Sequence, residues 1–202
     1  DLAEMEMRHA QAREAMKWTQ VYLHFVDEVL LEGVRVPEEN LLGQQGRGFA
    51  NFLASLDQGR VAIAALCVGA AQGCLEQAVE RARSRIVFDK PLGEHQHIAF
   101  TLARMQARVA SARALMHEAA RRLDAGIPFS QEASIAKLVG SHAAADNARD
   151  ACQIWGGYGF LNENVVARHY RDSRVLQVGE GTDEVQLGII AKHLGFPGAL
   201  AG

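Results

Sequence analysis

The residue types best suited to do chemistry lie together in the segment Glu180-Gly181-Thr182-Asp183-Glu184. A carboxylate on a loop directly before a helix can be aimed into a pocket as a general base. Gly181 has no Cβ, so a ligand can approach the main chain closely there. Thr182 or Asp183 could cap the helix that follows, whose free N–H groups favour anions. Because such a segment is also typical of an ordinary turn and cap, its interpretation depends on the rest of the chain.

Five other clusters also contain residue types that could bind a ligand or act in catalysis. Several of them also have a purely structural interpretation. The clusters are Asp57-Gln58-Gly59-Arg60, Arg85-Ile86-Val87-Phe88, His95-Gln96, Gln153-Ile154-Trp155-Gly156-Gly157-Tyr158-Gly159 and Tyr170-Arg171-Asp172. The Asp57–Arg60 spacing is typical of an ion pair on a helix surface. Arg85 would be favourable at a helix C-terminus, and Phe88 could be buried under a loop. We interpret Arg171 and Asp172 as a structural ion pair.

Hydrophobic periodicity predicts three long helices and two short ones that position these clusters. The first long helix covers about residues 49–85. The second follows the next loop and ends near Asp124. The third begins at Ser130, which resembles an N-cap, and ends at about Ile154. The short helices cover about 165–176 and 183–194, and residues 88–93 form a loop. The predicted apolar positions are Phe49, Phe52, Leu53, Leu56, Ile63, Val68, Leu75, Ile98, Leu102, Met105, Val109, Ala112, Met116, Ala119, Leu123, Ile135, Leu138, Val139 and Ala143.

These helices predict an all-α fold, an antiparallel bundle of the four-helix type, preceded by a short β or extended segment. We place the bundle at residues 47–196 and a tail at 197–202. Residues 1–46 form a separate region, in which 1–20 are charged, helix-permissive and unassigned. Residues 21–36 read as a strand or extended segment that ends at Pro37. Residues 37–48 read as a turn-rich connector.

The bulk composition limits the function classes. A formal net charge of −3 gives no electrostatic reason to expect nucleic acid. No apolar run approaches the roughly 20 residues that span a bilayer, and no signal peptide is visible. The three cysteines form no CxxC pair, Cys67 and Cys74 read as small core residues, and we expect no metal site. We therefore expect a soluble cytoplasmic protein, or a mitochondrial matrix protein in a eukaryote.

The order and spacing of these motifs resemble the carboxy-terminal helical domain of the acyl-CoA dehydrogenase family. The resemblance covers about residues 33–196, and residues 34–43 resemble the chain that leaves the family's middle β-domain. It therefore implies that residues 1–46 are a remnant of that β-domain or a link from it. It implies a homodimer or homotetramer that binds FAD and an acyl-CoA thioester and works with an electron-transfer partner. The implied reaction removes a proton from Cα and a hydride from Cβ, which yields a trans-2-enoyl-CoA.

The resemblance implies that Glu180 is the catalytic base. A carbon acid is very weak, so its base must be desolvated and the forming enolate must be stabilised. Some family members carry the base just before the Arg of Asp-x-x-Arg, where this chain has Gly59, so Glu180 is the remaining position. The implied substrate-binding residues are Asp57, Gln58, Gly59, Arg60 and Gly181.

The resemblance also implies a cofactor site. Arg85 corresponds to an arginine that meets the FAD diphosphate of the neighbouring subunit, which a guanidinium can bind bidentately. The complete implied set is Arg85, Phe88, His95, Gln96, Gln153, Ile154, Trp155, Gly156, Gly157, Thr182, Asp183 and Glu184.

The chain departs from the family pattern in three places. Asp89 replaces a usual glycine, and Val178-Gly179 replaces a common Ile-Tyr, which would widen the acyl pocket. The family's amino-terminal helical domain and most of its β-domain have no counterpart here. An excised domain, or a gene product that needs a partner, would explain this. A non-catalytic oligomerisation or partner module is the alternative, and a flavin monooxygenase or nitroalkane oxidase is disfavoured by Glu180.

Overall fold

The computed structural model describes residues 32–196 and residue 198, and it divides into two units, residues 1–45 and 46–202. In the first unit, the described residues are exposed and contain only the short 3₁₀ helix η1, Glu38–Asn40, which follows Pro37. Residues 32–37 contain no strand, and the rest of the predicted extended segment lies outside the described residues. The helix-permissive segment 1–20 and most of the tail also lie outside them.

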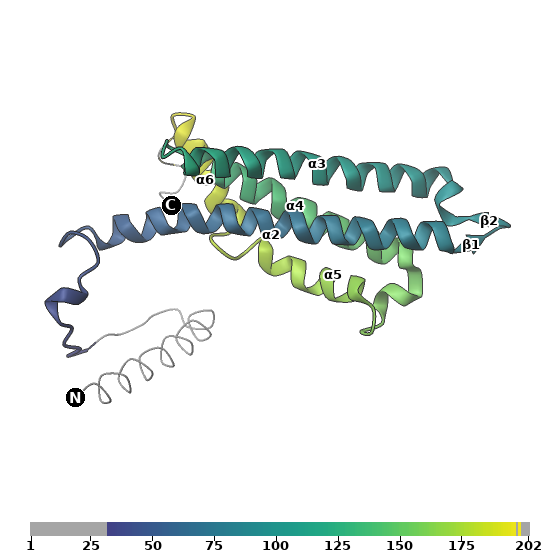
Figure 1. The fold of residues 1–202 in the computed structure, drawn as a ribbon, viewed down its shortest axis with the longest axis horizontal. Helices are drawn as coiled ribbons and strands as arrows, with labels where there is room; N and C mark the ends of the chain where they lie inside the picture. The colour runs from purple at the N-terminus through teal and green to yellow at the C-terminus, as the bar shows by residue number, and fades with distance from the viewer. Residues whose placement is uncertain (1–31, 197, 199–202) are drawn as a thin grey trace. The chain divides into compact units, whose positions relative to one another are not determined.

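The described part of the second unit contains five α-helices (Figure 1). Three are long: α2 Gly48–Ser84, α3 Gln96–Asp124 and α4 Ser130–Trp155. Two are short: α5 Val165–Leu176 and α6 Asp183–His193. Between them lie strands β1 Ile86–Val87 and β2 Lys90–Pro91 and the 3₁₀ helices η2 Leu92–Glu94 and η3 Gly156–Phe160. The all-α prediction is confirmed, and the predicted helix limits agree to within about two residues.

The connection between α2 and α3 differs from the predicted loop, because it is a tight antiparallel hairpin. Val87 pairs with Lys90, so Phe88 and Asp89 alone form its turn. Their φ angles are +52° and +65°, the left-handed conformation that a two-residue hairpin turn requires at both positions. Asp is among the few non-glycine residues that tolerate this conformation, so Asp89 fits where glycine is usual. The hairpin reverses the chain at one end of α2 and α3 (Figure 1).

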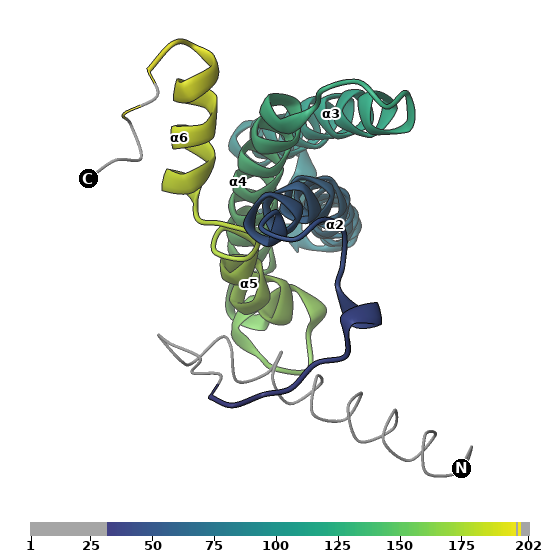
Figure 2. The ribbon, with the colours of Figure 1, turned by 90° about the vertical axis from the view of Figure 1, so that its left-hand side faces the viewer.

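Helix α4 is the centre of the bundle and packs against α2, α3, α5 and α6 (Figure 2). Its buried face is built mainly from small residues, and it approaches α2 so closely that a Cβ on Gly140 would lie 3.2 Å from Cβ of Cys67. Cys67 and Cys74 are buried, as expected of small core residues. Asn147 is fully buried and joins three helices, because its Nδ2 donates to the carbonyls of Ala71 (3.1 Å) and Met105 (3.2 Å).

The predicted apolar faces are only partly correct. On α3, Met105, Val109, Ala112 and Ala119 are buried as expected. On α2, Val68 and Leu75 are buried, but Phe49, Phe52 and Leu53 are 74%, 59% and 43% exposed. On α4, alanines line the core, whereas Ile135, Leu138 and Val139 are only half-buried. Side-chain size is a poor guide on α4, because its close approach to α2 at Gly140 and Cys67 is made by small residues.

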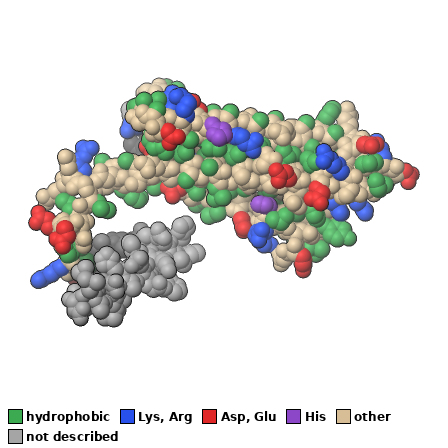
Figure 3. Space-filling model, viewed as in Figure 1, with side chains coloured by type: hydrophobic (Ala, Val, Ile, Leu, Met, Phe, Trp, Pro, Cys, Tyr) green, Lys and Arg blue, Asp and Glu red, His purple; other side chains and the backbone are tan. Residues whose placement is uncertain are grey.

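Helix α2 is the one described helix that is long and apolar enough to cross a bilayer, with a mean hydropathy of 1.4 in its most apolar window. This composition does not contradict the expectation of no membrane span. A core helix of a soluble protein passes the same test, and α2 packs along α3 and α4. On the face of the second unit in Figure 3, acidic and basic side chains are interspersed, without a large patch of either sign.

Candidate active site

Glu180 lies in the loop between α5 and α6, residues 177–182, which we call the 177–182 loop. Its φ angle is +58°, which is uncommon for a residue other than glycine. Gly181 follows with a φ of +94°, and a Cβ there would lie 2.9 Å from Nε2 of Gln186. Two consecutive positive φ angles turn the chain sharply. The turn leaves Glu180 half-buried, with its side chain against α2.

The Glu180 carboxylate packs directly on Gly59 of α2. A Cβ added to Gly59 would lie 2.6 Å from Oε2 of Glu180 and 2.9 Å from its Cδ, closer than atoms can approach without moving. Glycine at position 59 therefore provides the space that the carboxylate occupies. Two positions 121 residues apart, both singled out in the sequence, come into contact here.

Asp57 and Arg60 form an ion pair beside this contact, in which Arg60 is buried and Asp57 is half-buried, so the alternative of an ordinary surface pair does not apply. The side chains are 21% and 5% exposed. Arg60 Nε donates to the main-chain oxygen of Glu180 (3.3 Å). The hydroxyl of Ser130 donates to Oδ1 of Asp57 (3.0 Å), so Ser130 does not act as the predicted N-cap of α4. The pair thus connects α2, the start of α4 and the 177–182 loop, while Gln58 is exposed.

Asp183 contacts the neighbouring helix α4, and the Thr182 side chain does not cap α6 as expected. Thr182 occupies the N-cap position without a side-chain capping bond. Oδ2 of Asp183 lies 2.8 Å from Nε2 of His142, and its Oδ1 lies 3.8 Å from Nζ of Lys137. Glu184 is exposed, and its pKa is lowered chiefly by a hydrogen bond from the Thr182 side chain.

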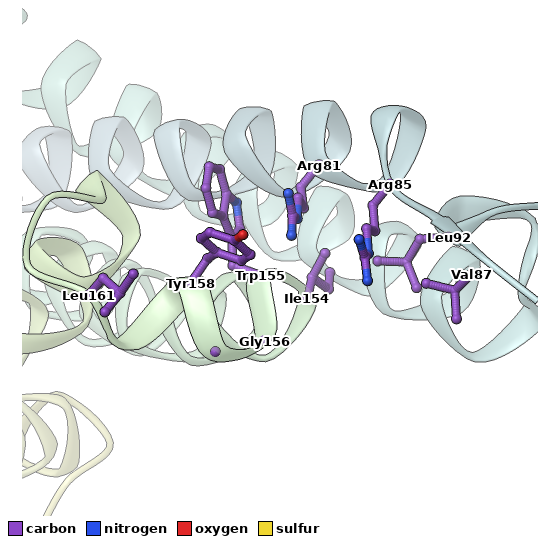
Figure 4. Close-up of a pocket in the computed structure, with 10 residues that line it drawn as sticks. Arg81, Arg85, Val87, Leu92, Ile154, Trp155, Gly156, Tyr158 and Leu161 are labelled. Atoms are coloured by element: carbon purple, nitrogen blue, oxygen red, sulfur yellow. The ribbon is translucent and has the colours of Figure 1, made fainter.

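The remaining predicted residues gather at the far end of α2. Over the 26 positions from Gly59 to Arg85, a helix rises about 39 Å. Here a cavity of about 560 Å³ opens between α2, the hairpin and η3 (Figure 4). Its lining includes Arg85, Ile154, Trp155, Gly156 and Gly157 from the predicted set, together with Arg81, Val87, Leu92, Tyr158 and Leu161.

Arg81 and Tyr158 give this cavity a feature that the sequence interpretation missed. The Arg81 guanidinium lies 5.4 Å from the Trp155 ring centre and 4.9 Å from that of Tyr158, as cation–π contacts do. Its Nε is buried without a hydrogen-bond partner. Arg81 stands one helical turn before Arg85, so this spacing could have revealed that both guanidinium groups share one face.

The other predicted cofactor residues lie on or beside the hairpin. Phe88 is 87% exposed, which excludes its burial under a loop, and its ring lies 6.2 Å from that of His95. Nε2 of His95 lies 3.0 Å from the carbonyl oxygen of Val87. Gln96 and Gln153 are exposed.

Two further sequence interpretations concern ion pairs and metals. Arg171 donates to Oδ1 of Asn162 (2.6 Å), and no ion pair joins it to Asp172 among the described residues. Within residues 32–196, no group of three or more His, Cys, Asp or Glu side chains could hold a metal ion.

Known proteins share both this sequence and this fold. Residues 46–195 match the family model "Acyl-CoA dehydrogenase, C-terminal domain". The short-chain specific acyl-CoA dehydrogenase of Megasphaera elsdenii is 44% identical over 160 residues, which cover 79% of this chain and 42% of that protein. An acyl-CoA dehydrogenase of Bacillus subtilis is 44% identical over 167 residues, which cover 83% of this chain and 44% of that protein.

Solved structures agree with these relatives. The butyryl-CoA dehydrogenase of M. elsdenii superposes with a TM-score of 0.79 at 44% identity, covering 80% of this chain and 42% of that one. The acyl-CoA dehydrogenase of Geobacillus kaustophilus gives 0.78 at 33% identity, covering 82% and 43%. The chain thus spans less than half the length of the relatives it matches. The family model covers most of the chain, and the chain belongs to the acyl-CoA dehydrogenase family, of which it contains the C-terminal helical domain.

Proposed function

We propose that the complete gene product carrying this chain is an FAD-dependent acyl-CoA dehydrogenase that converts an acyl-CoA thioester to its trans-2-enoyl-CoA. In this proposal the chain supplies the catalytic base and part of the cofactor site. The observation that carries it is the contact of the Glu180 carboxylate with Gly59, beside the Asp57–Arg60 ion pair. Its relatives that are named acyl-CoA dehydrogenases support the reaction class.

The role of Glu180 is to accept the Cα proton. Three features keep its carboxylate in place: the left-handed turn, the space above Gly59, and the hydrogen bond of Arg60 to the Glu180 main chain. A base held in one position needs no reorganisation at the moment of proton transfer. Half-burial of the side chain also limits the water that would compete for the carboxylate.

The cavity at the far end of α2 fits the ADP half of FAD. Arg81 and Arg85 line it with two guanidinium groups, and a guanidinium suits the geometry of a phosphate. The partnerless Nε of Arg81 is a donor that such a ligand could satisfy. Gly156 and Gly157 would let it approach the main chain. When bound near the acyl chain, FAD accepts the hydride that leaves Cβ.

The distance between the two sites supports a homo-oligomer. Glu180 contacts α2 at Gly59, about 39 Å along the helix from Arg85 at a rise of about 1.5 Å per residue. In a symmetric dimer, the Arg85 end of one chain can complete a cofactor site near Glu180 of the other. We therefore propose a homodimer or homotetramer.

An electron-transfer flavoprotein is the proposed electron-transfer partner. Similar proteins include the "Caffeyl-CoA reductase-Etf complex subunit CarC" of Acetobacterium woodii, at 39% identity over 167 residues. A chain in a solved structure of an electron transferring flavoprotein of Acidaminococcus fermentans matches with a TM-score of 0.79 at 35% identity.

The test is to purify the complete gene product and incubate it with butyryl-CoA and an artificial electron acceptor. We choose this substrate because several relatives are named as short-chain specific. A yellow protein that forms trans-2-enoyl-CoA is expected. A colourless protein that forms no enoyl product from acyl-CoAs of any chain length would contradict the proposal and favour a non-catalytic module.

A further inference from the structure

We propose that Lys137 of α4 is a positioning residue for Glu180, because its buried ammonium group holds the main chain on both sides of the catalytic carboxylate. The inference rests on the proposed function, since it assumes that Glu180 is the base. Lys137 acts through the loop, and it need not touch the substrate.

Lys137 donates hydrogen bonds to main-chain carbonyls on both sides of Glu180 in the sequence. Nζ donates to the carbonyl oxygen of Gln177 (3.1 Å) and to that of Gly181 (2.9 Å). Gln177 is the C-cap residue of α5, where a cation also interacts favourably with the helix dipole. A single ammonium group thereby ties the end of α5 to the turn that carries Glu180.

The burial of Lys137 calls for an explanation beyond packing. Its side chain is 0% exposed and is the largest fully buried one among the described residues. Burying an ammonium group is costly unless it is paired and hydrogen-bonded. An apolar side chain of similar length would fill the same space without that cost. The ammonium group lies where it donates hydrogen bonds to two carbonyls of the 177–182 loop.

Asp183 supplies partial compensation for this charge. Its Oδ1 lies 3.8 Å from Nζ of Lys137, is buried, and has no hydrogen-bond partner. Burial lowers the pKa of Lys137, and the Asp183 carboxylate opposes that shift. Asp183 is the first residue of α6, so this attraction fixes the other end of the same loop.

A second side chain holds the same turn. Nε2 of Gln186 donates to the carbonyls of Glu180 (3.1 Å) and Gly181 (2.9 Å), and Gln186 is itself fully buried. The carbonyl of Gly181 therefore accepts from both Lys137 and Gln186. Because Glu180 has a φ of +58°, which such residues rarely adopt, these donors offset the tendency of the turn to relax.

Relaxation of the turn would move the carboxylate away from Gly59 and from the substrate carbon. The loss should fall on kcat more than on KM, because the implied substrate-binding residues 57–60 lie on α2 and only Gly181 lies in the loop. A misplacement of about 1 Å costs roughly 100-fold in rate.

The test compares Lys137→Met and Asn147→Leu in the complete gene product. Asn147 is a matched control, since it is also fully buried on α4 but bonds to α2 and α3 instead of the loop. We expect Lys137→Met to lower kcat about 100-fold with little change in KM. Asn147→Leu should lower the thermal midpoint and leave kcat unchanged. Lys137→Gln keeps N–H donors and should recover part of the lost kcat.

Hydrogen–deuterium exchange gives a readout that does not need activity. In Lys137→Met, residues 177–182 should exchange faster relative to the bundle core, whereas Asn147→Leu should not single out this loop. If Lys137→Met does not fold, Lys137→Gln is compared with Asn147→Leu in its place. The inference is overturned if the Lys137 variants keep the wild-type kcat and loop protection, or if both positions lower kcat equally. A wild-type protein without dehydrogenase activity would instead refute the proposed function, and the exchange comparison would still test whether Lys137 holds the loop.

Discussion

Replacing Gly59 with alanine should lower the activity without lowering the stability of the fold. The new Cβ would lie 2.6 Å from Oε2 of Glu180, and ordinary contact begins near 3.4 Å, so the carboxylate must retreat by about 0.8 Å. The clashing atoms are the end of a flexible side chain, so the fold can accommodate the change. The cost then falls on the placement of the base.

The substitution should favour the helix and, at the same time, slow the reaction. Alanine within a helix is about 1 kcal/mol more favourable than glycine, so the thermal midpoint should not fall. A displacement of nearly 1 Å at the reacting group costs about 100-fold in kcat, or about 2.7 kcal/mol. The assay is steady-state dehydrogenation by the complete gene product, combined with thermal unfolding.

Gly69→Ala is the matched control in the same helix. A Cβ at Gly69 meets no atom within 4 Å, so this variant should gain the same helix stability and keep full activity. If Gly59→Ala were as active as Gly69→Ala, the carboxylate would not work from the position that the structure gives it, and the reasoning would be refuted.

Two further predictions concern the bundle. Asn147→Ala should lower the free energy of unfolding by about 2–3 kcal/mol in denaturant titrations, because a buried side chain and its hydrogen bonds to α2 and α3 are lost; an unchanged midpoint would contradict this role. Burial is the main cause that lowers the pKa of His169 below 6.5. The positive charge of Arg168 lowers this pKa further, and the negative charge of Asp172 raises it. The folded state therefore resists a proton that the unfolded state accepts, so stability should decline as pH falls below about 6.5. His169→Gln should flatten that part of the pH profile, and an identical profile would refute the assignment.

The sequence predicted the helices well because their limits depend on local signals. The short helix predicted over residues 165–176 is found at Val165–Leu176, and the long helices α3 and α4 end next to the glycine turns at Gly126 and Gly156. The register of the family motifs also indicated Gly59 and Glu180 separately. Their direct contact could not be predicted, because it depends on how α2 meets the 177–182 loop.

The missed features depend on tertiary packing. Nothing in the sequence around Lys137 shows that its ammonium group donates to the carbonyls of two residues about 40 positions away. The helical spacing of Phe49 and Phe52 predicts that they lie on a packed apolar face, yet both are exposed. Thr182 has the sequence of a cap, but its side chain makes no capping bond and Asp183 binds His142.

The most direct test of the account is turnover of Glu180→Gln in the complete gene product. Glutamine matches glutamate in size, so the variant should fold, and its amide cannot accept the Cα proton. We expect dehydrogenation to fall by about 10²–10⁴-fold, the usual contribution of a general base. Turnover equal to that of the wild type would show that Glu180 is not the base.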